Sequence, residues 1–112
     1  MWQKGIEIAV KTFKLIETFP KEDKYGICQQ MTNAGVSIPS NIAEGSSRRS
    51  EKDYARFIDI SLGSNFELET QLIIAEQLNK GNPNLLQELK AMLVDHQRML
   101  TGFQQKLNSS LQ

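Results

Sequence analysis

Apolar side chains recur at helical spacing near both ends of the chain. Steps of 4, 3, 4 and 3 residues separate Trp2, Ile6, Ala9, Phe13 and Ile16. Steps that alternate between 4 and 3 likewise separate Leu89, Leu93, His96, Leu100, Phe103 and Leu107. Residues at this spacing form one stripe along an α-helix. We therefore predict two amphipathic helices, each with its stripe buried against the rest of the protein.

A third apolar stripe indicates a helix in the second quarter of the chain. Its members are Ile27, Met31, Ala34, Ile38 and Ile42. Pro39 lies inside this segment and removes one backbone donor, which a helix tolerates only at a local cost. We expect the helix to continue through the proline with a kink there, where Ser37, Ser40 or Asn41 bonds to the freed carbonyl.

Three short turn-forming stretches divide the chain into four helices, predicted at residues 2–18, 23–46, 51–79 and 83–107. Pro20 ends the first helix, and Ser50 is well placed as the N-cap of the third. Asn82 and Pro83 suit the N-cap and first position of the fourth. Short connections favour antiparallel neighbours. The expected fold is all-α: a single domain over residues 1–112, folded as an antiparallel up-down-up-down four-helix bundle.

The third predicted helix is apolar around most of its circumference. Besides the residues that one core-facing stripe would need, it carries Phe66, Ile73 and Ile74. A helix that is apolar nearly all round must be covered on more than one side. We therefore predict that Phe66, Ile73 and Ile74 form a subunit interface and that the protein is a homo-oligomer.

Polar side chains form a separate stripe along the second helix. The stripe consists of Gln30, Asn33, Ser37, Asn41 and Glu44, at steps of 3, 4, 4 and 3. It is either a buried polar seam, within the bundle or between subunits, or an ordinary solvated face.

Glu69 of the third helix projects from an otherwise apolar sector. Its carboxylate either joins the polar network or an interface, or reaches water at the rim of the apolar surface.

Basic residues cluster once, at Arg48, Arg49, Lys52 and Arg56. The whole chain has 13 Lys and Arg and 13 Asp and Glu, so its formal net charge is zero. Dedicated nucleic-acid-binding proteins usually carry a basic excess, because phosphate contacts supply much of their affinity. The cluster therefore has two interpretations: Arg48, Arg49, Lys52 and Arg56 hold phosphates, or the arginines form ion pairs with Glu44, Glu51 or Glu69.

The sequence offers few candidate residues for catalysis or for metal binding. A di-iron bundle needs Glu-x-x-His pairs, and the chain has one histidine, His96, outside any such pair. Cys28 and His96 are the only candidate nucleophile and base. We interpret Cys28 as a buried apolar residue. His96 is either a hydrogen-bonded core residue or a proton-linked group. We predict no enzymatic activity, no metal site and no cofactor.

The expected location is the cytoplasm. A single cysteine suits a reducing compartment. The first residues lack the apolar run of a signal peptide, and no stretch is apolar over the length that a membrane span needs.

A specific pattern of residues covers nearly the whole chain. It centres on Val36-Ser37-Ile38-Pro39-Ser40-Asn41-Ile42-Ala43-Glu44-Gly45, followed by Arg48-Arg49, Phe57, Gly63-Ser64 and Glu67-Leu68-Glu69. Upstream lie Trp2-Gln3-Lys4, Phe19-Pro20 and Tyr25-Gly26. This pattern resembles that of the four-helix-bundle proteins called 23S rRNA intervening-sequence proteins. These are similar in fold to accessory proteins of diversity-generating retroelements, which form pentameric barrels that bind a reverse transcriptase and nucleic acid.

The resemblance implies a homo-oligomer, specifically a pentamer, that binds RNA or a nucleoprotein partner such as a reverse transcriptase. One departure weakens the nucleic-acid inference. The family often has two arginines just before the alanine of its second helix, and here Thr32 and Asn33 precede Ala34. The sequence therefore supports two functions: a homo-oligomeric scaffold that binds RNA or a nucleoprotein, or a protein–protein adaptor with no nucleic-acid role.

Overall fold

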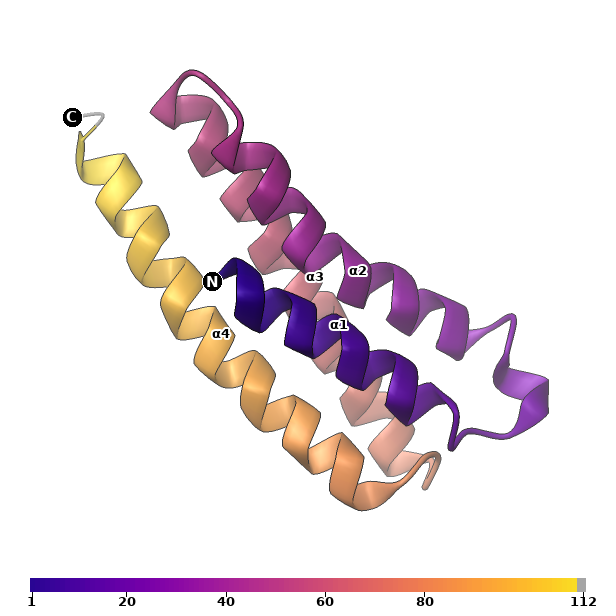
Figure 1. Ribbon diagram of the computed structural model, residues 1–112. Coiled ribbons are helices and arrows are strands. Elements are labelled where there is room, and N and C mark those ends of the chain that lie inside the picture. Colours follow the sequence, from indigo (N-terminus) through magenta and orange to yellow (C-terminus); the bar gives the residue numbers. More distant parts are fainter. Residues whose placement is uncertain (111–112) are drawn as a thin grey trace.

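The protein is all-helical over residues 1–110, the part of the chain that the computed structural model describes; residues 111–112 of the predicted domain lie outside it. Its elements are α1 (Trp2–Ile16), a short 3-10 helix η1 (Lys21–Asp23), α2 (Ile27–Ser46), α3 (Glu51–Gln77) and α4 (Pro83–Ser110). Figure 1 shows the chain turning back at each connection. The predicted all-α fold class with four helices is confirmed.

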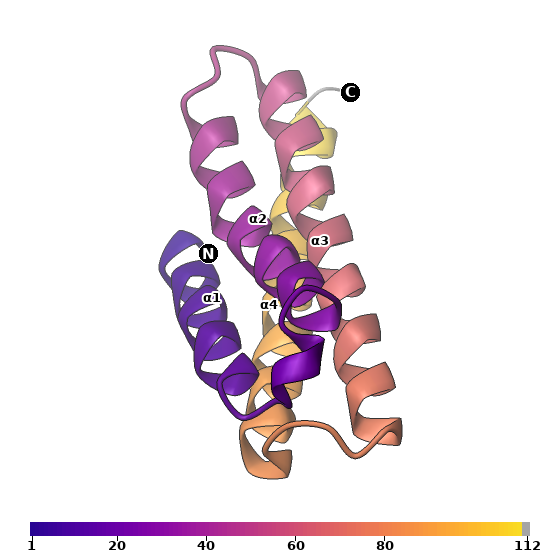
Figure 2. The same ribbon diagram turned by 90° about the vertical axis from the view of Figure 1, so that its right-hand side faces the viewer.

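Each helix packs against the next one along the chain, and α1 also packs against α4. The helices α1 and α3 therefore occupy opposite corners of the molecule, on opposite sides in Figure 2. The molecule is elongated, with extents of 48 × 22 × 19 Å. The α2–α3 turn lies at one end, and η1 and the α3–α4 turn lie at the other (Figure 1).

Two of the predicted helix starts are confirmed in detail. Ser50 caps α3, because its side chain accepts a hydrogen bond from the Asp53 backbone N–H at 3.1 Å. Asn82 caps α4 by accepting from the N–H groups of Asn84 and Leu85. Both caps satisfy N–H groups that have no partner within the helix.

The second helix begins at Ile27 rather than at the predicted residue 23. Lys21–Asp23 form η1 instead. The Asp23 carboxylate does not cap a helix; it accepts from Lys80 Nζ at 2.8 Å and so joins η1 to the α3–α4 turn. This contact joins residues far apart in sequence, so no local pattern indicates it.

The start of α1 at Trp2 and the end of α2 at Ser46 are as predicted, whereas three other boundaries differ by two or three residues. Helix α1 ends at Ile16, not 18, and the Thr18 hydroxyl donates back to the Leu15 carbonyl at 2.6 Å. Helix α3 ends at Gln77, not 79, because Asn79 adopts a left-handed conformation with φ of 56°. Helix α4 continues past the predicted residue 107 to Ser110.

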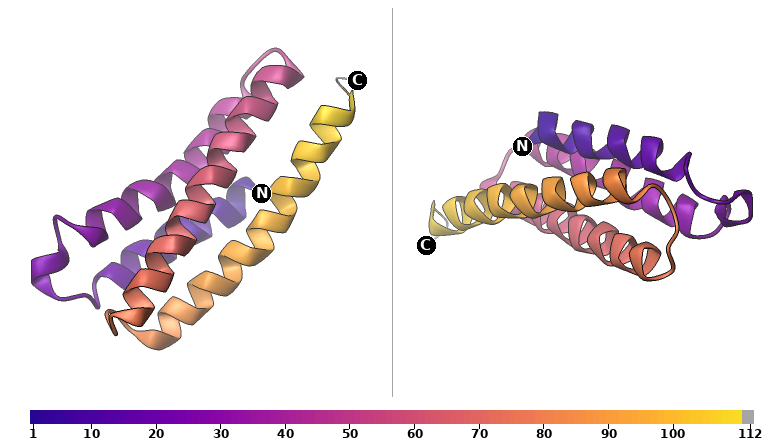
Figure 3. Two further views of the ribbon diagram at one scale, coloured as in Figure 1. Left: turned by 180° about the vertical axis from the view of Figure 1, so that it is seen from behind. Right: turned by 90° about the horizontal axis from the view of Figure 1, so that it is seen from below.

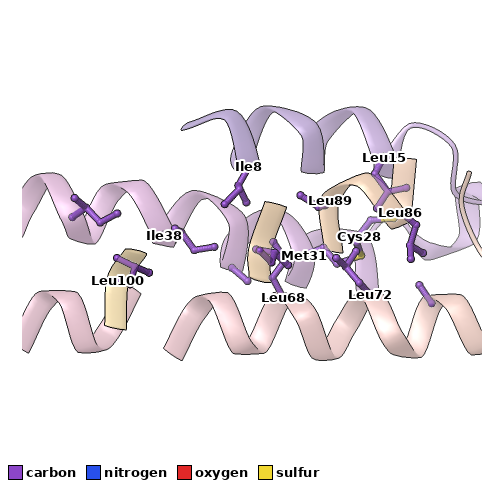
Figure 4. Close-up of a cluster of buried hydrophobic side chains, with 14 of the residues drawn as sticks. Ile8, Leu15, Cys28, Met31, Ile38, Leu68, Leu72, Leu86, Leu89 and Leu100 are labelled. Carbon is purple, nitrogen blue, oxygen red and sulfur yellow. The ribbon is translucent and has the colours of Figure 1, made fainter. Parts of the chain in front are cut away.

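The core runs along the axis of the molecule and consists mainly of aliphatic side chains (Figure 4). Its fully enclosed members include Ile8, Leu15, Met31, Ile38, Leu68, Leu72, Leu89, Leu93 and Leu100. The predicted apolar faces of α2 and α4 lie in or against this core, so these two predictions are confirmed. Among the described helices, none combines the length and apolarity required to cross a membrane.

The predicted core face of α1 is wrong. Trp2, Ile6 and Phe13, all on the stripe predicted to be buried, are exposed by 50%, 38% and 48%. The buried face consists instead of Gly5, Ile8, Thr12 and Leu15, at steps of 3, 4 and 3. The chain therefore has two stripes at helical spacing on α1, and the more apolar one faces outward.

Small residues explain why the other stripe is buried. A β-carbon at Gly5 would lie 3.1 Å from Cβ of Pro39, and one at Gly35 would lie 3.1 Å from Thr12 Oγ1. Thr12 can be buried because its hydroxyl donates to the Ile8 carbonyl at 2.8 Å. These contacts let α1 and α2 approach closely, and the close approach encloses Ile8 and Leu15.

Candidate functional site

Two arginines converge on one aromatic ring at the α2–α3 end of the bundle. The guanidinium carbons of Arg48 and Arg56 lie 4.8 and 4.6 Å from the ring centroid of Phe57. The ring itself is buried. Because Arg48 follows α2 and Arg56 lies in the second turn of α3, the turn at residues 47–50 brings them together. Cation–π contacts of this kind hold guanidinium groups in a defined place.

The other two members of the predicted basic cluster, Arg49 and Lys52, are exposed and form no ion pair with the described residues. Arg48 does form an ion pair, with the Glu44 carboxylate at 3.0 Å. Both partners are about half exposed, so this bond contributes little to stability. The Arg48–Glu44 pair is one of the ion pairs that the second interpretation expected, whereas phosphate binding by the cluster stays a prediction.

The polar stripe on α2 is a seam only at its centre. Ser37 Oγ lies 2.7 Å from Ser64 Oγ of α3, and Asn41 Nδ2 donates to the Ser37 hydroxyl and carbonyl at 2.9 and 2.8 Å. Ser64 and Asn41 are half-buried. The remaining predicted members, Gln30, Asn33 and Glu44, are exposed. Glu69 is half-buried on α3 and makes no ion pair with the described residues, so it does not join this seam.

A fully buried polar group lies elsewhere, at a position that the polar stripe does not include. Asn65 of α3 donates to the Leu93 carbonyl at 3.1 Å and accepts from Gln97 Nε2 at 2.8 Å, which joins α3 to α4. Ser61, also completely buried, donates to the Ile38 carbonyl at 2.8 Å. Ser61 and Asn65 continue the stripe formed by Ile58, Leu68 and Leu72 at steps of 3 and 4, and this spacing is the signal that could have revealed them.

Exposed apolar side chains gather on two separate faces. The α3 face contains the predicted interface residues Phe66, Ile73 and Ile74, exposed by 47%, 39% and 47%. The α1 face is the outward stripe of Trp2, Ile6 and Phe13 together with Val10. A monomeric protein rarely leaves contiguous apolar surface of this kind uncovered.

His96 and Cys28 do not meet. His96 is buried, and its Nε2 bonds the Met1 carbonyl at 2.8 Å, at the start of α1. Its Nδ1 is buried with no hydrogen-bond partner among the described residues, and burial lowers the pKa of the ring. Cys28 lies beyond the far end of α1, where burial and the nearby Asp23 carboxylate raise the pKa of its thiol. The length of α1, about 20 Å, separates the two groups.

A raised pKa keeps the Cys28 thiol protonated and weakly nucleophilic. Metal-ligating side chains also stay apart, because within residues 1–110 no three His, Cys, Asp or Glu residues converge.

Comparison with known proteins gave a family and a structural relative. The family whose sequence model matches residues 1–102 is described as 23S rRNA-intervening sequence protein. A crystal structure of a protein with unknown function from the S23 ribosomal protein family of Bacteroides thetaiotaomicron aligns with a TM-score of 0.85. The two share 21% sequence identity, and the alignment covers 93% of this chain and 94% of that one, so the likeness concerns the fold. A search of curated proteins gave no match.

Proposed function

Since the chain belongs to the 23S rRNA-intervening sequence protein family, we propose that it is a non-enzymatic, homo-oligomeric scaffold that binds RNA or an RNA-containing partner. Its subunit would be an antiparallel four-helix bundle. Binding would occur at the α2–α3 end, through Arg48, Arg49, Lys52 and Arg56. The observation that carries the proposal is the position of Arg48 and Arg56 against Phe57, next to two exposed cations.

The geometry suits phosphate recognition. Arginine presents a planar set of donors that matches phosphate oxygens. Holding Arg48 and Arg56 against one ring reduces the side-chain entropy that binding would otherwise cost. Within residues 1–110, no carboxylate forms an ion pair with Arg49 or Lys52, so both are available to a ligand.

Nucleic-acid-binding proteins usually carry a basic excess, whereas this chain has a net charge of zero. Assembly of several copies would compensate for this. One subunit offers at most four cations at this end, which is a weak site for a polyanion. Several copies would repeat the cluster, and linked sites bind much more tightly than one alone. The exposed faces on α1 and α3 support such assembly.

The test is a salt titration of RNA binding. A variant that makes one phosphate contact fewer should show a slope of log K against log salt concentration that is smaller by about 0.7–0.9. We expect Arg49→Ala to weaken binding and flatten this slope. Arg98→Ala is the matched control, because Arg98 is an exposed arginine on α4 outside the cluster. Equal affinities for wild type and Arg49→Ala, or equally weakened binding in Arg49→Ala and Arg98→Ala, would contradict the proposed site.

A second candidate function is a protein–protein adaptor with no nucleic-acid role. The observations that favour it are the zero net charge and the uncharged pair Thr32 and Asn33. Thr32 is half-buried and donates to the Gln29 carbonyl at 3.0 Å, which is a structural use of the position. The same titration separates the two functions, because an adaptor would show no RNA binding by wild type even at low salt. Protein partners retained after nuclease treatment would then identify it.

A further inference from the structure

The His96 ring has one nitrogen with a free lone pair. Its Nε2 lies 2.8 Å from the Met1 carbonyl. A carbonyl only accepts hydrogen bonds, so Nε2 carries the proton. Burial lowers the pKa of the ring and favours its neutral form, in which Nδ1 is unprotonated. His96 is only 1% exposed, and Nδ1 has no hydrogen-bond partner among the described residues. A buried acceptor without a partner costs free energy, so a group that takes up this lone pair would stabilise the site.

A hollow of about 90 Å³ lies beside His96, between α1 and α4. The left panel of Figure 3 shows the start of α1 beside the middle of α4, where the Met1 carbonyl meets the His96 ring. The residues that line the hollow are Lys4 and Ile8 of α1 and Met92, Asp95, His96 and Met99 of α4.

Two methionines flank His96 on the same face of α4. Met92 precedes it by four residues and Met99 follows it by three, and residues at these spacings share one side of a helix. Met92 is half-buried against the core, whereas Met99 is 39% exposed and is free to change its rotamer. One imidazole and two thioethers therefore line a single hollow.

We propose that Met92, His96 and Met99 form a binding site for Cu(I), with His96 Nδ1 and the two thioether sulfurs as ligands. Soft thioethers select Cu(I) over harder metals, and imidazole also suits copper. A histidine that binds a metal through one nitrogen usually donates its other N–H to a carboxylate or a backbone carbonyl, which fixes its tautomer. The Met1 carbonyl already provides this contact for His96.

Zinc and water fit the hollow less well than Cu(I). A zinc site takes roughly three or four protein ligands drawn from thiolate, imidazole and carboxylate. Here the lining offers one imidazole and the Asp95 carboxylate. A water molecule has room, since it needs only about 10–15 Å³, but it also needs about two to four polar partners. A thioether sulfur is a weak hydrogen-bond acceptor, so Met92 and Met99 offer water little.

The charges around the hollow consist of two ammonium groups and two carboxylates. Lys4 lines the hollow, and its Nζ pairs with the Glu7 carboxylate at 3.4 Å. Asp95 also lines it and forms no ion pair within the described part of the chain. The N-terminal ammonium is near enough to lower the pKa of His96 further. A monovalent cation is repelled less by the two ammonium groups than a divalent one, which also favours Cu(I).

A site of this class does not require the features on which the prediction of no metal site depends. That prediction concerns the Glu-x-x-His pairs of a di-iron bundle, which the chain lacks. Within residues 1–110, no three His, Cys, Asp or Glu residues converge either. Thioether ligands need neither feature. The proposed site is also independent of RNA binding and of assembly, because it lies within one copy and outside the basic cluster.

The test is competition for Cu(I) with a coloured Cu(I) chelator, without oxygen and without nucleic acid. We expect wild type to bind one Cu(I) per chain. Met92→Leu and Met99→Leu should each bind at least roughly tenfold more weakly, since even the loss of a contact to a ligand costs about 10–100-fold in metal affinity. Leucine has nearly the volume of methionine, so both variants should keep the helicity of wild type by circular dichroism. Met31→Leu is the matched control, because Met31 is a fully buried methionine outside the hollow.

A second variant and a spectrum identify the ligands. Cys28 is the one other soft ligand besides the methionines, since thiolates also bind Cu(I). We expect Cys28→Ala to bind Cu(I) as tightly as wild type. In NMR spectra of protein with isotopically labelled methionine methyl groups, one equivalent of Cu(I) should shift the signals of Met92 and Met99. The signal of Met31 should stay in place.

Three results would overturn the proposal. Wild type that binds no Cu(I) would show that the hollow holds water only. Binding that is lost in Cys28→Ala and retained in both Met92→Leu and Met99→Leu would assign the metal to the thiol. Equal weakening in Met31→Leu and in the two hollow variants would indicate a general loss of stability and not the loss of ligands.

Discussion

Gly35 of α2 lies against Thr12 of α1 so closely that a β-carbon on the glycine would stand 3.1 Å from the threonine hydroxyl oxygen. Thr12 is completely buried and its hydroxyl is committed to the Ile8 carbonyl, so its side chain has little room to move. This contact, with that of Gly5 on Pro39, sets how close the two helices come and therefore which side of α1 is buried.

We predict that Gly35→Val destabilises the protein by about 1–3 kcal/mol, because the added side chain must push α1 away from α2. The measurement is the free energy of unfolding from urea denaturation followed by circular dichroism. Gly102→Val is the matched control, since a β-carbon at that exposed helical position would meet no atom within 4 Å. Similar free energies of unfolding for the two variants would show that the close approach of α1 and α2 does not limit the size of the side chain at position 35.

We predict that the stability of the protein depends on pH because His96 is buried. Burial lowers its pKa below the ordinary 6.5 in the folded protein, so the unfolded chain binds the proton more readily. Stability is therefore complete above about pH 6.5 and falls as the pH drops below that value, by at most about 1.4 kcal/mol per pH unit. Unfolding free energies measured between about pH 7.5 and pH 5 should show this decline.

The control for the pH series is His96→Gln, which retains a donor for the Met1 carbonyl and does not titrate. Its stability should be nearly flat over the same range. His96 is the only histidine in the sequence, so no other histidine would mask the difference. A decline of equal size in His96→Gln would assign the effect to other groups.

We predict that RNA affinity depends on the packing of Arg48 and Arg56 on the Phe57 ring. Phe57→Leu removes the aromatic face that Arg48 and Arg56 share. An exposed cation–π interaction contributes about 0.5–1 kcal/mol, so we expect RNA affinity to fall roughly two- to five-fold for each arginine that no longer packs on a ring. Phe103→Leu is the control, because that ring packs on Tyr54, with centroids 5.0 Å apart, and is not the ring that the two arginines share. An equal decrease in both variants would indicate general destabilisation of the bundle.

The candidate site is only partly predictable from the sequence. Arg48, Arg49, Lys52 and Arg56 stand out because they cluster within nine residues. The role of Phe57 is not evident from the sequence, because its contact with both arginines depends on how the α2–α3 turn folds back. The polar stripe on α2 is continuous in sequence, yet only its centre bonds to α3, at Ser64. The buried position of Asn65 is not evident either, because its partners, Leu93 and Gln97, lie on another helix.

The sequence by itself determined the number of helices, the first residues of α1, α3 and α4, the last residue of α2, and the buried faces of α2 and α4. These properties are local: a cap bonds within its own turn, and periodicity reports the apolar face of a single helix. Only the tertiary structure decided which of two stripes on α1 is buried. Both have helical spacing, and the choice depends on the fit of Gly5 to Pro39 and of Thr12 to Gly35, which are contacts between helices. The more apolar stripe was thereby left on the surface, because close packing of small residues, and not apolar content alone, selected the buried side.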